Sequence, residues 1–360
     1  MYHGGTRIRR LNSTQSTHKT QLTLITVHER MHGRKRSARE ELDPPEVRAA
    51  KADKYKQYLQ GCKLALSSEQ AAAKAEKLLR YNPDFLTLWN ARRRAILRDL
   101  DRPGGEDLDH QTRKVMLETE LALTKEQISE RNSKSYGAWF HRRWAIETIG
   151  RVGGEIICDL NAELVLCDQL LLRDERNFHC WAHRHVIAHL AQVSAEETLN
   201  KSSALIEKNF SNYSAWHLRV QALSRLLVGE GKEYDWNKEF DLVHQAVFTE
   251  PADQSAWLYF RWLLTKDAAL GGSGEGRIRD EIDVVLSLLD EEGDCKWPLL
   301  ALLQLYSKLP FSEDTKAIAL DVCERIQRVD AGHVRFYEFV ASLFDKGDTA
   351  KLHKTLFCSV

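Results

Sequence analysis

One arrangement of apolar and polar positions returns along most of the chain, and each copy centres on a tryptophan. In four copies a residue that can cap a helix stands four positions before the tryptophan, namely Ser135, Asn177, Asn212 and Asp253. An apolar residue follows seven positions after the tryptophan, two helical turns along the same face. Further apolar residues lie ten to eleven positions before it, where a preceding helix would end. Each copy therefore predicts two helices joined by a tight turn.

The copies are spaced as stacked helical hairpins are. Five copies are clear and a sixth is weaker, and their tryptophans are Trp89, Trp139, Trp181, Trp216, Trp257 and Trp297. The steps between successive tryptophans vary from 35 to 50 residues, a period typical of helical repeat proteins. The pattern predicts an all-α chain in which neighbouring hairpins share a continuous core.

An arginine stands three positions after four of these tryptophans, at Arg92, Arg142, Arg184 and Arg219. It lies one turn along the helix and close to the buried face, where an unpaired guanidinium is costly. We therefore expect it to bind helix C-terminal carbonyls or acidic residues of the neighbouring repeat, for example Asp174 and Glu175. The tryptophans and arginines are interpreted as core and inter-repeat packing residues.

Residues 1–30 differ from the rest of the chain. Five basic residues stand among many serines and threonines, with Glu29 as the only acid. This composition resembles a transit peptide only superficially, and we expect a disordered or non-native extension ahead of a start at Met31. Residues 31–360 are predicted to form a single helical-repeat domain. The Gly271–Gly276 stretch lacks the Gly-Lys-Ser/Thr ending of a phosphate-binding loop, so it is predicted to be a connector.

Composition narrows the function classes. The 52 Lys and Arg residues balance 52 Asp and Glu residues, so no bulk charge indicates nucleic acid or a membrane surface as a partner. The seven cysteines include no Cys-x-x-Cys pair, and reduced thiols in a cytoplasmic protein are expected. No run approaches the roughly 18 apolar residues that cross a bilayer, so the chain is predicted to be soluble.

No self-contained active site is visible in the residue pattern. Histidines gather between positions 141 and 189, but no carboxylate stands at metal-ligand spacing, so we expect no zinc site within this chain. Lys134 and His179 are different, because each stands just before a repeat tryptophan at the mouth of a helix. Basic groups at adjacent helix N-termini favour an anion. The alternative is that both are ordinary solvated turn residues.

The recurring Asn/Lys-x-Tyr-x-x-Trp-x-x-Arg pattern resembles the repeats of protein prenyltransferase alpha subunits. The resemblance covers about Met31 to the C-terminus. Within that family the chain is most similar to the alpha subunits of Rab geranylgeranyltransferases, through Met31–Arg34, Asn82–Asn90, Lys134–Gly137, Asp174–Trp181 and Cys295–Trp297. The resemblance implies a crescent-shaped, right-handed α–α superhelix. An immunoglobulin-like insertion and leucine-rich repeats, which some larger relatives carry, are not expected here.

The resemblance also implies an activity and partners. It implies an obligate heterodimer with a prenyltransferase beta subunit, which carries the zinc and most of the isoprenoid pocket. The enzyme would transfer geranylgeranyl from geranylgeranyl diphosphate to C-terminal cysteines of Rab GTPases presented by a Rab escort protein. Lys134 matches the family's alpha-subunit lysine that reaches the diphosphate. Tyr136 and His179 match residues lining the same mouth.

Two other functions remain open on the sequence. The chain could be the alpha subunit shared by farnesyltransferase and type I geranylgeranyltransferase, which act on CaaX proteins. It could also be a non-catalytic scaffold of tetratricopeptide type, although the repeat steps do not hold near 34 residues and Arg follows each Trp where that motif has Leu-Gly.

Overall fold

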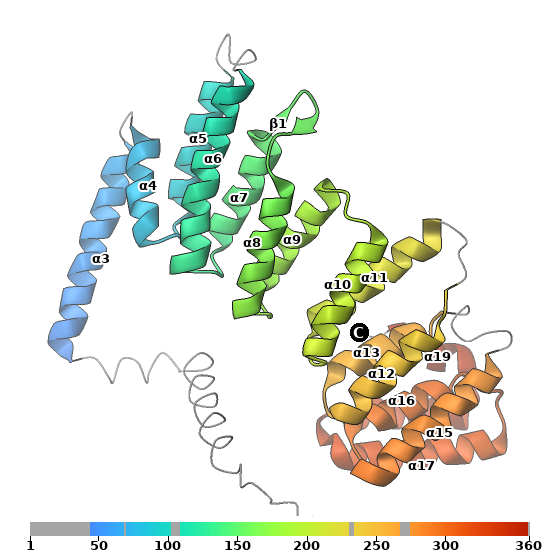
Figure 1. The fold of residues 1–360 in the computed structure, drawn as a ribbon. Helices are drawn as coiled ribbons and strands as arrows, with labels where there is room; N and C mark the ends of the chain where they lie inside the picture. The colour runs from blue at the N-terminus through green and yellow to red at the C-terminus, as the bar shows by residue number, and fades with distance from the viewer. Residues whose placement is uncertain (1–43, 68–69, 102–108, 230–233, 267–273, 359–360) are drawn as a thin grey trace, which may run out of the picture. The chain divides into compact units, whose positions relative to one another are not determined.

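The computed structural model describes residues 44–67, 70–101, 109–229, 234–266 and 274–358. Helices dominate these residues (Figure 1), which confirms the predicted all-α class of helical hairpins. The α-helices are α3 (Pro45–Leu66), α4 (Ala71–Tyr81), α5 (Leu86–Leu100), α6 (His110–Glu126), α7 (Tyr136–Thr148), α8 (Leu160–Arg173), α9 (Phe178–Leu190), α10 (Ala195–Lys208), α11 (Tyr213–Gly229), α12 (Asn237–Thr249), α13 (Gln254–Leu263), α15 (Glu275–Glu292), α16 (Lys296–Tyr306), α17 (Glu313–Val329), α18 (Val334–Asp345) and α19 (Thr349–Cys358).

The chain divides into two compact units, Met1–Gln127 and Ile128–Val360. A short π-helix, Gln127–Arg131, stands at the division. Within the first unit α4 packs against α5, and within the second α8 packs against α9, α10 against α11 and α12 against α13. The predicted extension over residues 1–30 lies outside the described residues. The single domain expected over residues 31–360 stays a prediction.

Four of the predicted caps form the helix starts as expected. The side chains of Ser135, Asn177, Asn212 and Asp253 accept hydrogen bonds from backbone N–H groups in the first turns of α7, α9, α11 and α13. Such caps satisfy N–H groups that a helix leaves without intrahelical partners. The sequence therefore located these helix starts correctly.

Each of the five clear repeat tryptophans makes the same hydrogen bond. Its indole N–H donates to the carbonyl six residues earlier, in the turn that precedes the helix, at 2.7 to 2.9 Å. The acceptors are Pro83, Ser133, Glu175, Phe210 and Pro251. The tryptophan thus packs against the helices and also stabilises the turn through this hydrogen bond, because a buried indole N–H needs a partner.

Among the five clear repeats, the tryptophan of the third repeat is less buried than expected. Trp89, Trp139, Trp216 and Trp257 are at most 4% exposed, whereas Trp181 is only partly buried. Trp181 lines a cavity of about 690 Å³ together with His185, Tyr213 and other side chains of α9 and α11. The prediction that Trp181 is a full core residue was therefore wrong, because the neighbouring hairpin does not close over it.

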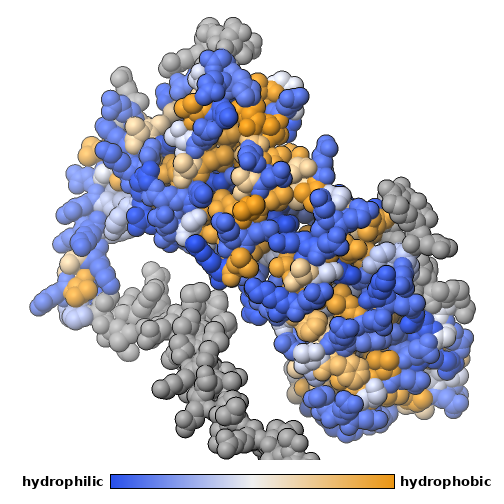
Figure 2. All heavy atoms as spheres, viewed as in Figure 1, coloured by the Kyte–Doolittle hydropathy of each residue, from blue (hydrophilic) through white to orange (hydrophobic). Residues whose placement is uncertain are grey.

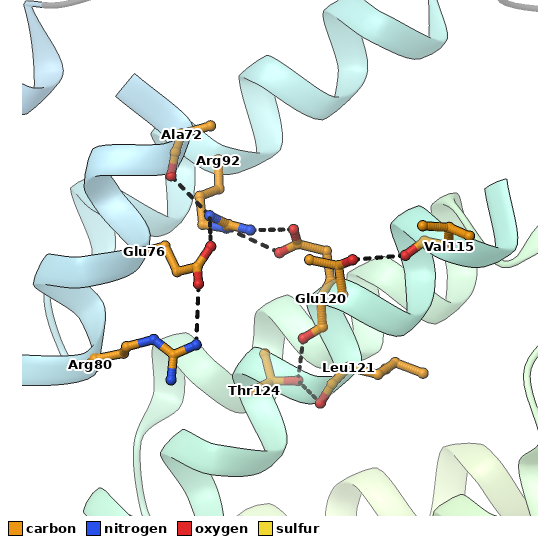
Figure 3. Close-up of polar contacts among 9 residues, drawn as sticks. Ala72, Glu76, Arg80, Arg92, Val115, Glu120, Leu121 and Thr124 are labelled. Carbon is orange, nitrogen blue, oxygen red and sulfur yellow. Dashed lines mark hydrogen bonds and ion pairs between the residues drawn. The ribbon is translucent and has the colours of Figure 1, made fainter. Parts of the chain in front are cut away.

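The repeat arginines pair with acids, as expected, but not with the acids named from the sequence. Arg92 binds Glu120, as Figure 3 shows, while Arg142 binds Glu163, Arg184 binds Asp168 and Arg219 binds Glu239. In three of these pairs the acid lies on the helix that follows the arginine's helix. Each buried guanidinium thus has a countercharge, which removes the cost of burying it alone. Asp174 and Glu175 have other partners.

Two glycine-containing segments connect helices of successive repeats. The residues around Gly153–Gly154 form a small hairpin, with β1 (Arg151–Val152) antiparallel to β2 (Glu155–Ile156). Gly153 and Gly154 have φ values of 57° and 92°, the left-handed conformation that a two-residue hairpin turn requires. Of the predicted Gly271–Gly276 connector, the last two residues already belong to α15, and residues 271–273 lie outside the described residues.

The second unit holds a continuous hydrophobic core that runs from α10 to α19. Trp216, Phe240, Phe260, Tyr337 and Phe344 are among its largest fully or nearly fully buried side chains. Hydrophilic residues cover much of the visible face of the C-terminal helices (Figure 2), as expected when amphipathic helices turn their apolar sides inward. The weak sixth repeat is present as the hairpin of α15 and α16, with Trp297 partly buried.

Candidate functional site

Lys134 lies in the turn before α7, and hydrogen bonds fix the backbone of this turn. Its own N–H donates to Asn132 Oδ1 at 3.0 Å. The carbonyl of Ser133 accepts from Trp139 Nε1 at 2.7 Å and from Asn177 Nδ2 at 2.8 Å. Because Asn177 also caps α9, the turn that carries Lys134 is fastened to the start of the helix that carries His179.

The Lys134 ammonium has one partner among the described residues. Its Nζ lies 2.9 Å from Asp174 Oδ2, and the lysine and aspartate side chains are 46% and 25% exposed. Asp174 is the C-cap residue that follows α8, so this ion pair joins two successive repeats. An ammonium has three N–H donors, so one contact leaves donors for a ligand.

Tyr136 and His179 lie beside each other at the starts of α7 and α9. Their ring centroids are 4.1 Å apart at an interplanar angle of 83°. His179 is 8% exposed, whereas Tyr136 is 67% exposed. Burial and, next, the nearby Lys134 charge hold the pKa of His179 below its ordinary value, so the imidazole is neutral near pH 7. A neutral imidazole can still donate one ring N–H.

The structure therefore brings together the three residues singled out from the sequence. Lys134 supplies a charge, and His179 and Tyr136 supply neutral donors at the N-terminal ends of two helices. The N-terminal ends of helices favour negative charge. This arrangement suits an anion with several oxygens, such as a phosphate group.

A metal site is a separate question. Within the described ranges, no three His, Cys, Asp or Glu side chains are grouped so that they could hold a metal ion. The gathered histidines make other contacts instead, since His183 binds Glu163 and His185 and His189 line the cavity beside Trp181. Six cysteines are free thiols: Cys62, Cys158, Cys167, Cys180, Cys295 and Cys323. No helix in the described part of the chain has the length and apolar character that crossing a bilayer demands.

Sequence reasoning missed the part that Asp174 plays beside Lys134. A signal exists, because an Asn or Asp stands seven residues before four of the tryptophans, at Asn82, Asn132, Asp174 and Asn209. In all four copies this side chain accepts a hydrogen bond from the backbone N–H two residues later. Such turns place the same atoms at the same point of each repeat.

Comparisons with known proteins agree with the repeat architecture. A family described as "Protein prenyltransferase alpha subunit repeat" matches residues 117–149, 160–190, 195–226 and 236–267. The last three segments coincide with the hairpins α8–α9, α10–α11 and α12–α13. A solved structure, "Candida albicans protein geranylgeranyltransferase-I complexed with GGPP", superposes with a TM-score of 0.59 over 80% of this chain and 91% of that chain. At 19% identity this likeness concerns the fold alone.

Curated relatives are named "Geranylgeranyl transferase type-2 subunit alpha". Those of Sus scrofa and Homo sapiens are each 37% identical over 248 residues, which is 65% of this chain. The matched region is 42% of the length of each of these two relatives. The relative from Dictyostelium discoideum is 32% identical over 259 residues, covering 71% of this chain and 79% of its own length. Repeats, helix boundaries and relatives agree: the chain belongs to the family of protein prenyltransferase alpha subunits, alongside the alpha subunits of type-2 geranylgeranyl transferases.

Proposed function

We propose that this chain is the alpha subunit of a heterodimeric protein geranylgeranyltransferase. The enzyme transfers geranylgeranyl from geranylgeranyl diphosphate to C-terminal cysteine thiols of Rab GTPases that an escort protein presents. The names of the curated relatives support the type-2 reaction over the CaaX reaction and over a non-catalytic scaffold. The observation that carries the proposal is the cluster of Lys134, Tyr136 and His179.

In this reaction a cysteine sulfur bonds to C1 of the isoprenoid while the bond from C1 to the diphosphate oxygen breaks. The thiol proton is lost, and the electron pair of the broken bond leaves with the diphosphate. Negative charge therefore grows on the leaving oxygens, and a fixed cation there lowers the barrier. The Lys134 ammonium supplies this charge, and it acts more strongly on the transition state than on the bound substrate.

His179 and Tyr136 orient the same leaving group. A neutral imidazole donates a hydrogen bond without competing with Lys134 for the negative charge. The rings of Tyr136 and Phe178 both pack against His179, and the exposed Tyr136 side chain can meet the substrate. Zinc, expected on the beta subunit, would favour the thiolate form of the acceptor cysteine.

The decisive experiment is reconstitution. The chain is produced together with candidate prenyltransferase beta subunits, and the purified heterodimer receives a labelled geranylgeranyl diphosphate. We expect transfer to a Rab GTPase in the presence of an escort protein and little transfer to CaaX peptides. Preferred transfer to CaaX peptides would assign the chain to the other class of prenyltransferase. A chain that assembles with no beta subunit would contradict the proposal.

A further inference from the structure

Asp174 carries a negative charge that its turn does not require. The equivalent positions of three other repeats hold Asn82, Asn132 and Asn209, and each accepts the same hydrogen bond from the N–H two residues later. Asp174 Oδ1 accepts that bond from Arg176 at 3.1 Å. An amide oxygen serves this turn as well as a carboxylate oxygen does. The turn therefore explains the oxygen at position 174 but not its charge.

Helix stability does not explain the charge either. Asp174 is the C-terminal cap of α8, where the unpaired carbonyls give the helix end a partial negative charge. A carboxylate there is unfavourable, whereas a cation is favoured. The Lys134 ammonium supplies that cation, 2.9 Å from Asp174 Oδ2. The carboxylate thus makes sense only together with the lysine of the preceding repeat.

The pair also limits where the ammonium can be. One carboxylate oxygen is held by Arg176 N–H and the other meets Lys134, so the anchor is rigid. The backbone of Lys134 is rigid as well, because Ser133 and Asn132 are both hydrogen-bonded. A lysine side chain otherwise samples many rotamers. Fixed at both ends, the ammonium is confined to the place where the turns before α7 and α9 meet.

Resting on the proposed function, we propose that Asp174 is a positioning residue for Lys134. Asp174 holds the ammonium where the turns before α7 and α9 meet before the substrate arrives, and it stays bound to one N–H donor while the others bind the diphosphate. The carboxylate also repels the bound diphosphate. It therefore weakens ground-state binding while keeping the cation where charge develops.

The test is a double-mutant cycle in the assembled heterodimer, with Asp174→Asn, Lys134→Ala and the double variant. Asp174→Asn restores the residue that three other repeats use, so the turn is retained. We expect geranylgeranyl diphosphate to bind about threefold to tenfold tighter and the single-turnover rate to fall about tenfold. In the Lys134→Ala background, Asp174→Asn should leave the single-turnover rate unchanged but should still tighten binding, because the repulsion between the carboxylate and the diphosphate does not depend on the lysine. Asp345→Asn, which removes the carboxylate 3.0 Å from Lys316 Nζ, is the matched control and should leave both unchanged.

The outcomes separate this inference from the proposed function. A slow Lys134→Ala enzyme with an unaltered Asp174→Asn enzyme overturns the positioning role and leaves the function standing. An equal loss of single-turnover rate on Asp174→Asn with and without Lys134 also overturns it, because Asp174 would then act on the rate on its own. An unaltered Lys134→Ala enzyme contradicts the proposed role of the lysine itself.

A second measurement uses the assembled heterodimer without substrate. An amine held against a carboxylate reacts more slowly with an acylating reagent, so Asp174→Asn should speed the labelling of Lys134 about twofold to fivefold, read by peptide mass spectrometry. Asp345→Asn should speed labelling of Lys316 and not of Lys134. Unchanged labelling of Lys134 in Asp174→Asn would show that the pair does not hold the ammonium in solution, and the inference would fail.

Discussion

The same repeat forms two junctions that differ, one between α7 and α8 and one between α9 and α10. Only the first is closed by a buried ion pair between its two helices. In the first, Arg142 on α7 reaches forward to Glu163 on α8, and both side chains are at most 6% exposed. In the second, Arg184 on α9 turns back to Asp168 on α8, whose side chain is 32% exposed. The cavity of about 690 Å³ opens beside this second junction.

A single sequence position accounts for the difference in pairing. Glu163 and Glu239 each stand 18 residues before the next repeat tryptophan, and Glu120 stands 19 residues before Trp139. The equivalent position before Trp216 is Thr198, which has no charge. Arg184 consequently pairs with Asp168 on α8, where Lys201 of α10 joins it. Where the following helix supplies no acid, the guanidinium takes its countercharge from another helix, because burying it unpaired is costly.

The largest expected effect on stability comes from breaking the closed junction. Arg142→Ala leaves Glu163 buried without its main countercharge and should lower the free energy of unfolding by about 3–5 kcal/mol. Arg184→Ala should cost only about 1 kcal/mol, because Asp168 is partly solvated and keeps Lys201. Urea unfolding measures both. Exposed Arg143, which pairs with Glu147 on its own helix, is the control, and Arg143→Ala should be nearly neutral. Equal costs for Arg142→Ala and Arg184→Ala would contradict the comparison.

The second largest effect on stability is expected when the pH is lowered, because the junction between α7 and α8 depends on the charge of Glu163. Burial by itself would raise the pKa of Glu163, but the hydrogen bond with His183 and the charge of Arg142 lower it to about 2 from an ordinary 4.5. Because the folded pKa lies below the unfolded one, this stabilisation is complete above about pH 4.5 and is lost as pH falls toward 2. The two values correspond to about 3 kcal/mol. Unfolding free energies measured across this window should decline less steeply in Glu163→Gln than in the parent, and an identical slope would refute the assignment.

A smaller difference in stability is expected between variants of two repeat tryptophans, Trp216 and Trp181. Trp216→Phe removes the indole N–H that binds the Phe210 carbonyl in a site that is 2% exposed, and should cost about 2 kcal/mol. Trp181→Phe removes the equivalent bond to Glu175 at the edge of the cavity, where water can replace the donor, and should cost about 1 kcal/mol. Thermal and urea unfolding of both variants give the comparison. A larger loss for Trp181→Phe would indicate that the cavity is closed in solution.

The sequence predicted the repeats because their determinants are local. A cap, a tryptophan four residues later and an apolar residue seven beyond it lie within one helix, so spacing alone locates them. Trp181 was assigned to the core for the same reason, since its own helix looks like the others. Its exposure depends on how the next hairpin packs, which one repeat does not encode. The hairpin at Gly153–Gly154 was likewise missed because only four residues pair.

Three residues of the candidate site could be named from the sequence, but the contacts between them could not. Lys134, Tyr136 and His179 were singled out from their positions before the tryptophans and from family resemblance, and the structure places them together. Asp174 was expected to pair with a repeat arginine, whereas the structure pairs it with Lys134. Only the stacking of successive turns brings residue 174 to residue 134. Contacts between repeats thus need a structure, whereas positions within a repeat need only the pattern.

The smallest effect on stability is expected at the ion pair between Lys134, in the turn before α7, and Asp174, the C-cap of α8. Lys134→Ala should change the free energy of unfolding by less than about 1 kcal/mol, because the lysine side chain is 46% exposed and its pair is solvated. The single-turnover rate of prenyl transfer should nevertheless fall about a hundredfold, as when one donor to a developing anion is removed. Lys316→Ala, which removes another Lys–Asp pair, should change neither quantity. Arg142→Ala and Lys134→Ala would then affect different measurements, the first stability and the second rate. If Lys134→Ala lowered stability as much as Arg142→Ala and left the rate intact, the exposed pair would be a structural contact like the buried one.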